Sequence, residues 1–256
     1  MKLYQELAHW WQLFSPVEEY ADEAASFLQI LQENCASPCR TVVEFGSGAG
    51  SNAFYLKKQF EMTLVDLSPN MLAVSQVINP ECEHLVGDMR FVRLGRLFDA
   101  VFIHDAIMYI TSEDDLHRTM ETAYLHCKPG GAAVIAPDYV RETFKPTTEH
   151  GGRDGTGAED KDRSLRWLMW SFDPDSSDTT YAVHYAFLLK KGEVVNIEHD
   201  QHTEGLFARA EWSRLFEQVG FNQFQIIIDL YDREVFVALK PKDDATRDST
   251  GAEFAF

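Results

Sequence analysis

Residues 41–66 read TVVEFGSGAGSNAFYLKKQFEMTLVD. A β-branched run enters a loop in which three glycines alternate with small residues, at Gly46, Gly48 and Gly50. A helical pattern follows, and a second apolar run, residues 62–65, ends on an acid. This order predicts a strand, a tight turn, a helix and a second strand, which together form one βαβ unit. Glycines at the turn let the backbone approach a bound cofactor, because no Cβ stands in the way.

Asp66 follows the second predicted strand, where an acid can accept both hydroxyls of a ribose. The glycine spacing is G-x-G-x-G, which differs from the nicotinamide fingerprint G-x-G-x-x-G. The run from Glu44 through Gly50 resembles motif I of the class I methyltransferases that depend on S-adenosylmethionine (SAM). This resemblance implies that the loop packs against the methionine part of the cofactor and that Asp66 holds its ribose. Taken alone, the loop also fits a Gly-rich turn in some other α/β protein.

Composition limits the classes of partner. The chain has 256 residues, a formal net charge of -18 and 45% hydrophobic residues, which is enough for a globular α/β domain with an insertion. Its acidity argues against a nucleic-acid partner or an anionic membrane, since phosphate binding favours a basic face. It fits a small or cationic substrate, and it also fits a charged surface that only keeps the protein soluble.

The cysteines indicate neither a metal site nor a disulfide framework. The four cysteines form no C-x-x-C pair, and no histidine cluster has the spacing of metal ligands. The first residues lack the apolar segment of a signal peptide, and no apolar run is long enough to span a bilayer. We therefore expect no bound metal, no membrane contact and a cytoplasmic location.

Two further motifs lie downstream of Asp66. A short predicted strand, Cys82 to Val86, leads into Asp88-Met89-Arg90, which by the same resemblance forms the adenine site. A fourth predicted strand, Phe98 to Ile103, ends at His104-Asp105. Polar side chains at the carboxyl end of a buried parallel strand point into the crevice where α/β proteins bind ligands, so both are candidates for contact.

The remaining chain divides into predicted segments. Helical spacing of apolar residues predicts two helices, residues 3–14 and 17–33, and a later helix from Thr111-Ser112-Glu113 to about Cys127, before a fifth strand at 132–136. The polar stretch 150–157 reads as a loop, and three strand-like runs follow it, at 165–172, 179–189 and 193–202. The segments are an N-terminal helical lid (1–40), a SAM-binding Rossmann-like core (41–136), an antiparallel β insertion that roofs the substrate (137–208), the last helix with a closing β-hairpin (209–240), and a flexible tail (241–256).

The resemblance extends over the chain up to the tail. The predicted fold is an α/β, Rossmann-like, seven-stranded methyltransferase sheet with N-terminal helices and a small antiparallel β insertion. Within the class, the chain is most similar to the aminosugar N,N-dimethyltransferases of antibiotic biosynthesis, which also insert an antiparallel sheet after the fifth strand. Two features depart from that pattern. Trp11 and Ser15 stand where two tyrosines would align, and His104-Asp105 replaces small polar and apolar residues, so we expect different pocket chemistry.

The motifs and the resemblance together give a set of candidate site residues. The predicted cofactor contacts are Tyr4, Trp11, Glu44, Gly46, Ser47, Gly48, Gly50, Asp66, Leu67, Met71, Asp88, Met89, Arg90 and His104. The predicted substrate contacts are Tyr109, Asp138, Tyr139, Arg141 and His202. The candidates for catalysis are His202, His104 and Asp105. His202 ends the last insertion strand, and we expect it to face the acceptor.

The resemblance implies transfer of a methyl group from SAM to an N or O nucleophile of a small molecule. A neutral amine needs little more than placement, whereas a hydroxyl also needs a base. The alternative is a non-catalytic SAM-binding sensor or partner subunit, because the cofactor motifs would look the same. A nicotinamide enzyme is disfavoured by the loop spacing. A homodimer is left open.

Overall fold

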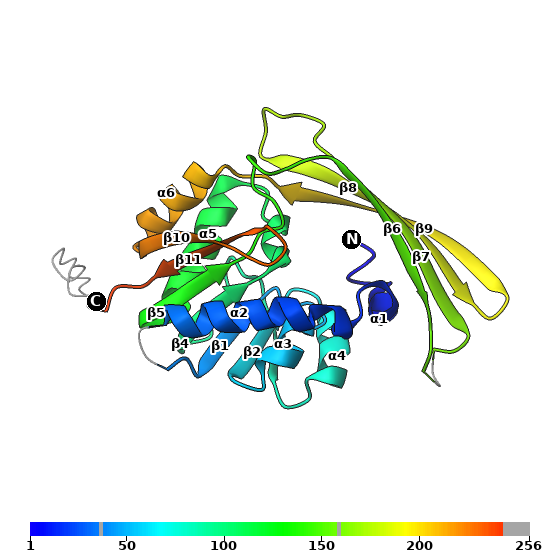
Figure 1. Ribbon diagram of the computed structural model, residues 1–256, viewed down its shortest axis with the longest axis horizontal. Coiled ribbons are helices and arrows are strands. Elements are labelled where there is room, and N and C mark those ends of the chain that lie inside the picture. Colours follow the sequence, from blue (N-terminus) through cyan, green and yellow to red (C-terminus); the bar gives the residue numbers. More distant parts are fainter. Residues whose placement is uncertain (36–37, 158–159, 243–256) are drawn as a thin grey trace, which may run out of the picture.

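A seven-stranded sheet forms the centre of the molecule (Figure 1). The computed structural model describes residues 1–35, 38–157 and 160–242. The strands are β1 (Thr41–Phe45), β2 (Glu61–Asp66), β3 (Glu83–Val86), β4 (Phe98–Ile103), β5 (Cys127–Ile135), β10 (Asn222–Ile228) and β11 (Glu234–Leu239). Their order across the sheet is β10-β11-β5-β4-β1-β2-β3; β11 is antiparallel to both of its neighbours, β10 and β5, and the other neighbouring pairs are parallel. The predicted Rossmann-like fold class is confirmed.

Helices cover both faces of this sheet, because its strands alternate apolar side chains between the faces. Val42 packs with α2 (Ala21–Asn34) and α3 (Ser51–Leu56) on one face. Val43 packs with α5 (Glu113–His126) and α6 (Arg209–Val219) on the other. The remaining helix of the core, α4, spans Pro69–Ile78. None of the helices in the described part of the chain is long and apolar enough to cross a membrane.

Serine side chains cap the starts of two helices. Ser68 caps α4 by accepting a hydrogen bond from the Met71 N–H at 3.2 Å, and Pro69 occupies the first turn. Ser112 caps α5 in the same way, through the Asp115 N–H at 3.2 Å. Since β2 ends just before α4 begins, this cap holds the turn after Asp66 in a fixed place.

The insertion is an antiparallel sheet of four strands, one more than predicted. It comprises β6 (Thr147–Asp154), β7 (Arg163–Phe172), β8 (Thr180–Lys191) and β9 (Val194–Gly205). The prediction of a loop at 150–157 was wrong as far as Asp154, because β6 pairs with β7 over its full length. An exposed edge strand needs no apolar alternation. Gly151 lies so close to the Trp167 ring that a Cβ there would come within 2.9 Å of it.

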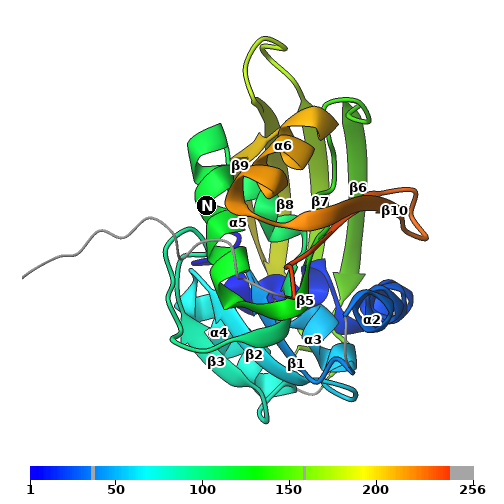
Figure 2. The same ribbon diagram turned by 90° about the vertical axis from the view of Figure 1, so that its left-hand side faces the viewer.

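One face of the insertion packs on the core. Tyr181, Val183, Tyr185 and Phe187 of β8 are buried in the same apolar cluster as α5 and α6. The four strands extend beyond the edge of the central sheet, with the N-terminal segment beside them (Figures 1 and 2). The N-terminal segment therefore lies where both the core and the insertion can contact it.

Several predicted boundaries were wrong. The single helix predicted at 3–14 is instead a turn, a 3-10 segment (Ala8–Trp10) and the short α1 (Trp11–Phe14). Its first residues make other contacts, because the Leu3 N–H donates to Asp200 and the Tyr4 carbonyl accepts from Ser68. A second 3-10 segment, Val17–Tyr20, leads into α2, and β5 begins at Cys127, five residues before the predicted start at 132. Apart from its first two residues, the predicted tail 241–256 lies outside the described residues.

Candidate active site

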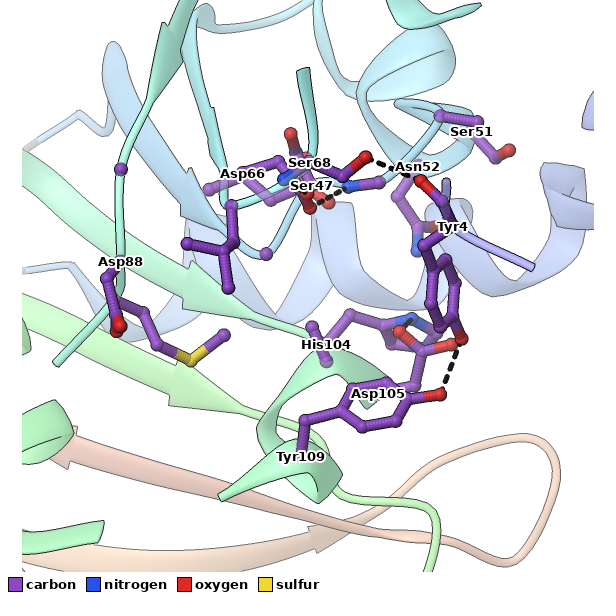
Figure 3. A pocket seen from close by; sticks show the side chains of 18 of the residues that line it. Tyr4, Ser47, Ser51, Asn52, Asp66, Ser68, Asp88, His104, Asp105 and Tyr109 are labelled. Carbon is purple, nitrogen blue, oxygen red and sulfur yellow. Dashed lines mark hydrogen bonds and ion pairs between the residues drawn. The ribbon is translucent and has the colours of Figure 1, made fainter. Parts of the chain in front are cut away.

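A cavity of about 230 Å³ opens at the carboxyl ends of β1, β2 and β4, below the N-terminal segment (Figure 3). Its walls contain twelve of the predicted cofactor contacts: Tyr4, Trp11, Glu44, Gly46, Ser47, Gly48, Asp66, Leu67, Asp88, Met89, Arg90 and His104. Asp105 and Tyr109, predicted for catalysis and for substrate, line it as well. The topology explains this gathering, since the carboxyl ends of parallel strands meet at one edge of the sheet.

The glycine loop forms the floor of the cavity by close backbone approach. Gly46 has φ +71°, and a Cβ there would lie 2.3 Å from the Ala106 Cβ. Gly50 also has φ +71°, but its missing Cβ makes room for the Ser75 hydroxyl of α4. Neither Gly50 nor Met71 lines the cavity, so their predicted cofactor contact is corrected to a packing role beneath the loop.

Asp66 ties the glycine loop to the end of β2. Its Oδ2 accepts from the Gly48 N–H at 2.8 Å and its Oδ1 from the Ser68 N–H at 2.7 Å. Burial raises the pKa of this carboxyl, while the two N–H donors act in the opposite direction. Each carboxylate oxygen keeps a second lone pair, so the group can still accept from ligand hydroxyls.

Asp88 and Arg90 form the opposite end of the cavity. The guanidinium Nη2 lies 2.6 Å from Asp88 Oδ2, and its Nη1 lies 2.7 Å from Asp115 Oδ2. The hydrogen bond from Arg90 holds the pKa of Asp88 below its ordinary value, so Asp88 is an ionised acceptor. Its contact with an adenine amino group stays a prediction.

The cavity walls hold buried polar atoms that have no hydrogen-bond partner among the described residues. They are Trp11 Nε1, Glu44 Oε2, Ser47 Oγ, Ser51 Oγ and Asn52 Oδ1. Leaving such atoms unpaired costs free energy, about 1–3 kcal/mol each, so the arrangement fits a polar ligand that satisfies them. The set offers donors for a carboxylate and acceptors for an ammonium, which are the two charged groups of a methionine moiety.

The comparisons with known proteins agree with this geometry. The family model of a methyltransferase domain matches residues 42–131, which include the glycine loop, Asp66 and Asp88. The chain thus carries a methyltransferase domain over residues 42–131, and we assign it as a SAM-dependent methyltransferase. The similar proteins are methyltransferases, one of them with SAM bound, which favours an enzyme that uses SAM over the alternative of a non-catalytic SAM-binding protein.

Similar proteins include aminosugar methyltransferases. The chain is 26% identical over 208 residues to dTDP-3-amino-3,4,6-trideoxy-alpha-D-glucopyranose N,N-dimethyltransferase of Streptomyces venezuelae, covering 79% of this chain and 84% of that protein. Its fold matches the crystal structure of Streptomyces venezuelae DesVI with a TM-score of 0.77 at 22% identity, over 87% of this chain and 92% of that one. It also matches a SAM-bound amino pentose methyltransferase from Micromonospora echinaspora with a TM-score of 0.73 at 21% identity, over 86% and 91% of the two chains.

His104 lines the cavity of this methyltransferase but is held as an imidazolium. Its Nε2 lies 3.1 Å from Glu23 Oε1 and its Nδ1 lies 3.3 Å from Asp105 Oδ1. Burial lowers the pKa of His104, but the two carboxylates outweigh it and raise the pKa well above the ordinary value. An imidazolium has no free lone pair, so the geometry does not support His104 as a general base. It instead fixes the Asp105 carboxylate beside the cavity.

Four predicted substrate residues do not line the cavity. Arg141 donates hydrogen bonds to the carbonyls of Ser176, Asp178 and Leu206, so its side chain stabilises the backbone of the insertion. Tyr139 packs edge-on against Phe144 and Tyr181. Asp138 lies 3.7 Å from Arg233 Nη1 and keeps a side chain that is 40% exposed.

His202 is the fourth, and its predicted contact with the acceptor is corrected. Its side chain is completely buried and contacts Tyr109, whose hydroxyl lies 2.9 Å from His202 Nδ1. Tyr109 and Tyr4, and not His202, present their rings to the cavity. The sequence correctly predicted that His202 lies near the end of the last insertion strand. Position in a strand does not reveal that the rings of Tyr109 and Tyr4 lie between His202 and the cavity.

Sequence reasoning missed several residues at the site. Ser51, Asn52, Ser68 and Tyr20 line the cavity, and Glu23 supports it through His104. Ser51 and Asn52 directly follow the glycine loop, which was an available signal. Glu23 lies within an amphipathic helix, where an acid usually faces solvent, so no local signal could have identified it.

Proposed function

We propose that this methyltransferase methylates the amine of a small molecule. Bound SAM supplies an electrophilic methyl group on its sulfonium, and the chain has to bind and orient the nucleophile. The observation that carries the proposal is the Asp105 carboxylate, which lines the cavity with a side chain that is 51% exposed. Burial raises the pKa of Asp105, but the charge and hydrogen bond of His104 lower it by more, so the net shift is downward. Asp105 is therefore an anion, which suits an ammonium or amine.

Methyl transfer also needs a neutral amine, so an acceptor that arrives as an ammonium must lose a proton before it can attack. Burial and the neighbouring charge of Asp105 raise the pKa of Asp138 to about 6, but Asp138 does not line the cavity. In the proposed sequence the acceptor ammonium therefore gives its proton to solvent. The neutral amine then takes the methyl group, which leaves a methylated ammonium and the thioether form of the cofactor.

The charges around the cavity also bear on the rest of the acceptor. Among the described residues that line it, the basic side chains are Arg90 and His104, and both are paired with carboxylates. Neither side chain is free for a diphosphate, and the N-terminus of Met1 is the other cation among these residues. We therefore favour an amino sugar or another small amine, and the acceptor test below includes both a free and a nucleotide-linked amine. The cysteines are free thiols, which supports a cytoplasmic location. The homodimer stays a prediction, since the structure describes one chain.

The proposal is tested with matched acceptors. Purified protein is incubated with SAM and either glucosamine, glucose or dTDP-3-amino-3,4,6-trideoxy-α-D-glucopyranose, and methylated product is measured by mass spectrometry. We expect methylation of an amine and none of glucose. The variant Asp105→Asn should lower kcat/KM for the amine by about tenfold to a hundredfold, because a charged hydrogen bond is lost. Methylation of glucose, or of no amine in a wider set of amines, would contradict the proposal.

A further inference from the structure

A continuous hydrogen-bond chain runs from the insertion to the cavity. Asp200 Oδ2 lies 3.0 Å from His202 Nε2, and His202 Nδ1 lies 2.9 Å from the Tyr109 hydroxyl. The Tyr109 hydroxyl in turn lies 2.6 Å from the Tyr4 hydroxyl. The chain therefore joins β9, the segment after β4 and the N-terminal segment, which are far apart in the sequence. Figure 3 shows its last link, between Tyr4 and Tyr109.

We propose that His202 is a positioning residue that fixes the direction of this chain, and that the Tyr4 hydroxyl is thereby made a hydrogen-bond acceptor for the N–H groups of the amine substrate. This inference rests on the proposed function. It adds to that function a role for His202, which lies outside the cavity. It also gives a physical reason for the enzyme to prefer a nitrogen nucleophile over an oxygen nucleophile.

The direction of the chain follows from Asp200. Its Oδ2 also accepts from the Leu3 N–H at 2.8 Å. Burial raises the pKa of Asp200, but these hydrogen bonds outweigh it and the net shift is downward, so Asp200 is an ionised acceptor. His202 Nε2 must then carry a proton, because an unprotonated nitrogen would place two acceptors 3.0 Å apart.

The other ring nitrogen of His202 is an acceptor. Burial lowers the pKa of His202 more than Asp200 raises it, so the ring is neutral and Nδ1 has a lone pair. The other groups around the ring are Glu204, whose Oε1 is 4.0 Å from Nδ1, the rings of Tyr4 and Tyr185, and the charge of the N-terminus. Glu204 is beyond hydrogen-bond distance of Nδ1; it accepts from the Tyr181 hydroxyl and also forms a hydrogen bond with the Tyr109 hydroxyl. The Tyr109 hydroxyl is the donor within reach of Nδ1.

Each hydroxyl has a single proton, so the direction passes along the chain. Because Tyr109 donates to His202, its oxygen accepts from Tyr4 at 2.6 Å. Tyr4 has then used its proton, and its oxygen can only accept. Among the described residues, Tyr109 is the recorded partner of the Tyr4 hydroxyl. Lone pairs of the Tyr4 oxygen are therefore available to a ligand.

Tyr4 and Asp105 both line the cavity, and each offers it a hydrogen-bond acceptor. Burial, Tyr185 and the charge of Asp105 all raise the pKa of Tyr4, so its hydroxyl stays protonated and keeps the direction of the chain. A neutral primary amine, or the ammonium form of a primary or secondary amine, carries at least two N–H donors and can satisfy both acceptors. A hydroxyl nucleophile carries one donor and would leave one acceptor unpaired.

The experiment compares replacements of His202 that differ only in hydrogen bonding. His202→Phe keeps a ring but removes the acceptor for Tyr109, so the chain can reverse and turn the Tyr4 proton toward the cavity. His202→Gln keeps a donor for Asp200 and an acceptor for Tyr109. The matched control is His199→Phe, because His199 lies on the same strand but its partner is His184, outside this chain. Michaelis constants are measured with the amine found in the acceptor test, and SAM and its demethylated product are titrated by calorimetry.

We expect His202→Phe to raise the amine KM by about tenfold while SAM affinity stays within about twofold. His202→Gln should restore most of the affinity, and His199→Phe should resemble the wild type. Tyr109→Phe should match His202→Phe, and the double variant should be no worse than either, because both act through one chain. Tyr109→Phe also carries the test if His202→Phe does not fold.

Additive effects of the two replacements would overturn the inference. Weaker SAM binding with an unchanged amine KM would also overturn it, because that result would show that Tyr4 and Asp105 contact the cofactor and not the amine. A wild-type enzyme that methylates no amine refutes the proposed function, whereas methylation that is indifferent to His202 and Tyr109 refutes this inference alone.

Discussion

Glu44 is a carboxyl whose protonation depends on what occupies the cavity. It is almost completely buried, its Oε2 has no partner among the described residues, and burial raises its pKa to about 8. At neutral pH the group is therefore largely protonated. A ligand ammonium would favour the carboxylate, so cofactor binding should release a proton here.

This coupling gives the first prediction. From pH 6 to 7.5 the cofactor amino group stays mostly charged. SAM should bind about tenfold more tightly at the upper end of this window, because less free energy is then needed to deprotonate Glu44. Glu44→Gln should bind SAM more weakly and lose the pH dependence. Calorimetry in buffers of different ionisation enthalpy measures both the affinity and the proton release. An equal pH dependence in both proteins would place the ammonium elsewhere.

The glycine loop acts at the scale of an element, because one turn positions β1, α3 and the segment after β4. Gly46 and Gly95 have nearly the same backbone angle, φ +71° and +68°, but a Cβ at Gly46 would contact Ala106, whereas one at Gly95 meets nothing within 4 Å. The two sites therefore separate backbone strain from steric contact.

We predict that Gly95→Ala costs about 1 kcal/mol of unfolding free energy, the usual penalty for a left-handed non-glycine residue. Gly46→Ala should cost about 1–3 kcal/mol more, since overpacking adds to the strain, and it should also weaken SAM binding. Urea denaturation followed by circular dichroism measures both free energies. Equal losses in the two variants would show that the loop moves away from Ala106 without cost.

At the scale of the whole molecule, an ion network holds three distant segments together. Arg233, between β10 and β11, pairs with Glu23 of α2 and with Asp229 at 2.7 Å. Glu23 also pairs with His104 at the end of β4. Although burial opposes it, His104 and Arg233 lower the pKa of Glu23 to about 2, so Glu23 is ionised at neutral pH.

Removing the shared cation should be costly. Arg233→Ala leaves Glu23 and Asp229 buried without their guanidinium, and a broken buried pair typically costs about 3–5 kcal/mol. The matched control is Arg214→Ala, which breaks an exposed pair with Glu113 between α6 and α5 and should cost under about 1 kcal/mol. Chemical denaturation measures both variants. A loss of stability in Arg233→Ala no larger than in the control would show that the network contributes specificity of structure and not stability.

The sequence by itself determined the local parts of this protein. The glycine spacing, the β-branched runs and the acid at Asp66 specify a turn between two strands, because backbone sterics and side-chain alternation act over a few residues. The same signals placed Asp88 and Asp105 at strand ends, and parallel pairing then brings such ends together. This pairing of strand ends explains why twelve of the predicted cofactor contacts line a single cavity. The same local signals also predicted the methyltransferase fold.

The tertiary structure alone decided what lies in front of each candidate and which charges are paired. His202 is behind Tyr109, Arg141 is held by carbonyls of the insertion, and Glu23 is buried beneath His104. β6 is a strand only because β7 pairs with it. These outcomes depend on contacts between segments that are far apart along the chain, and no pattern within a short window of residues encodes such contacts.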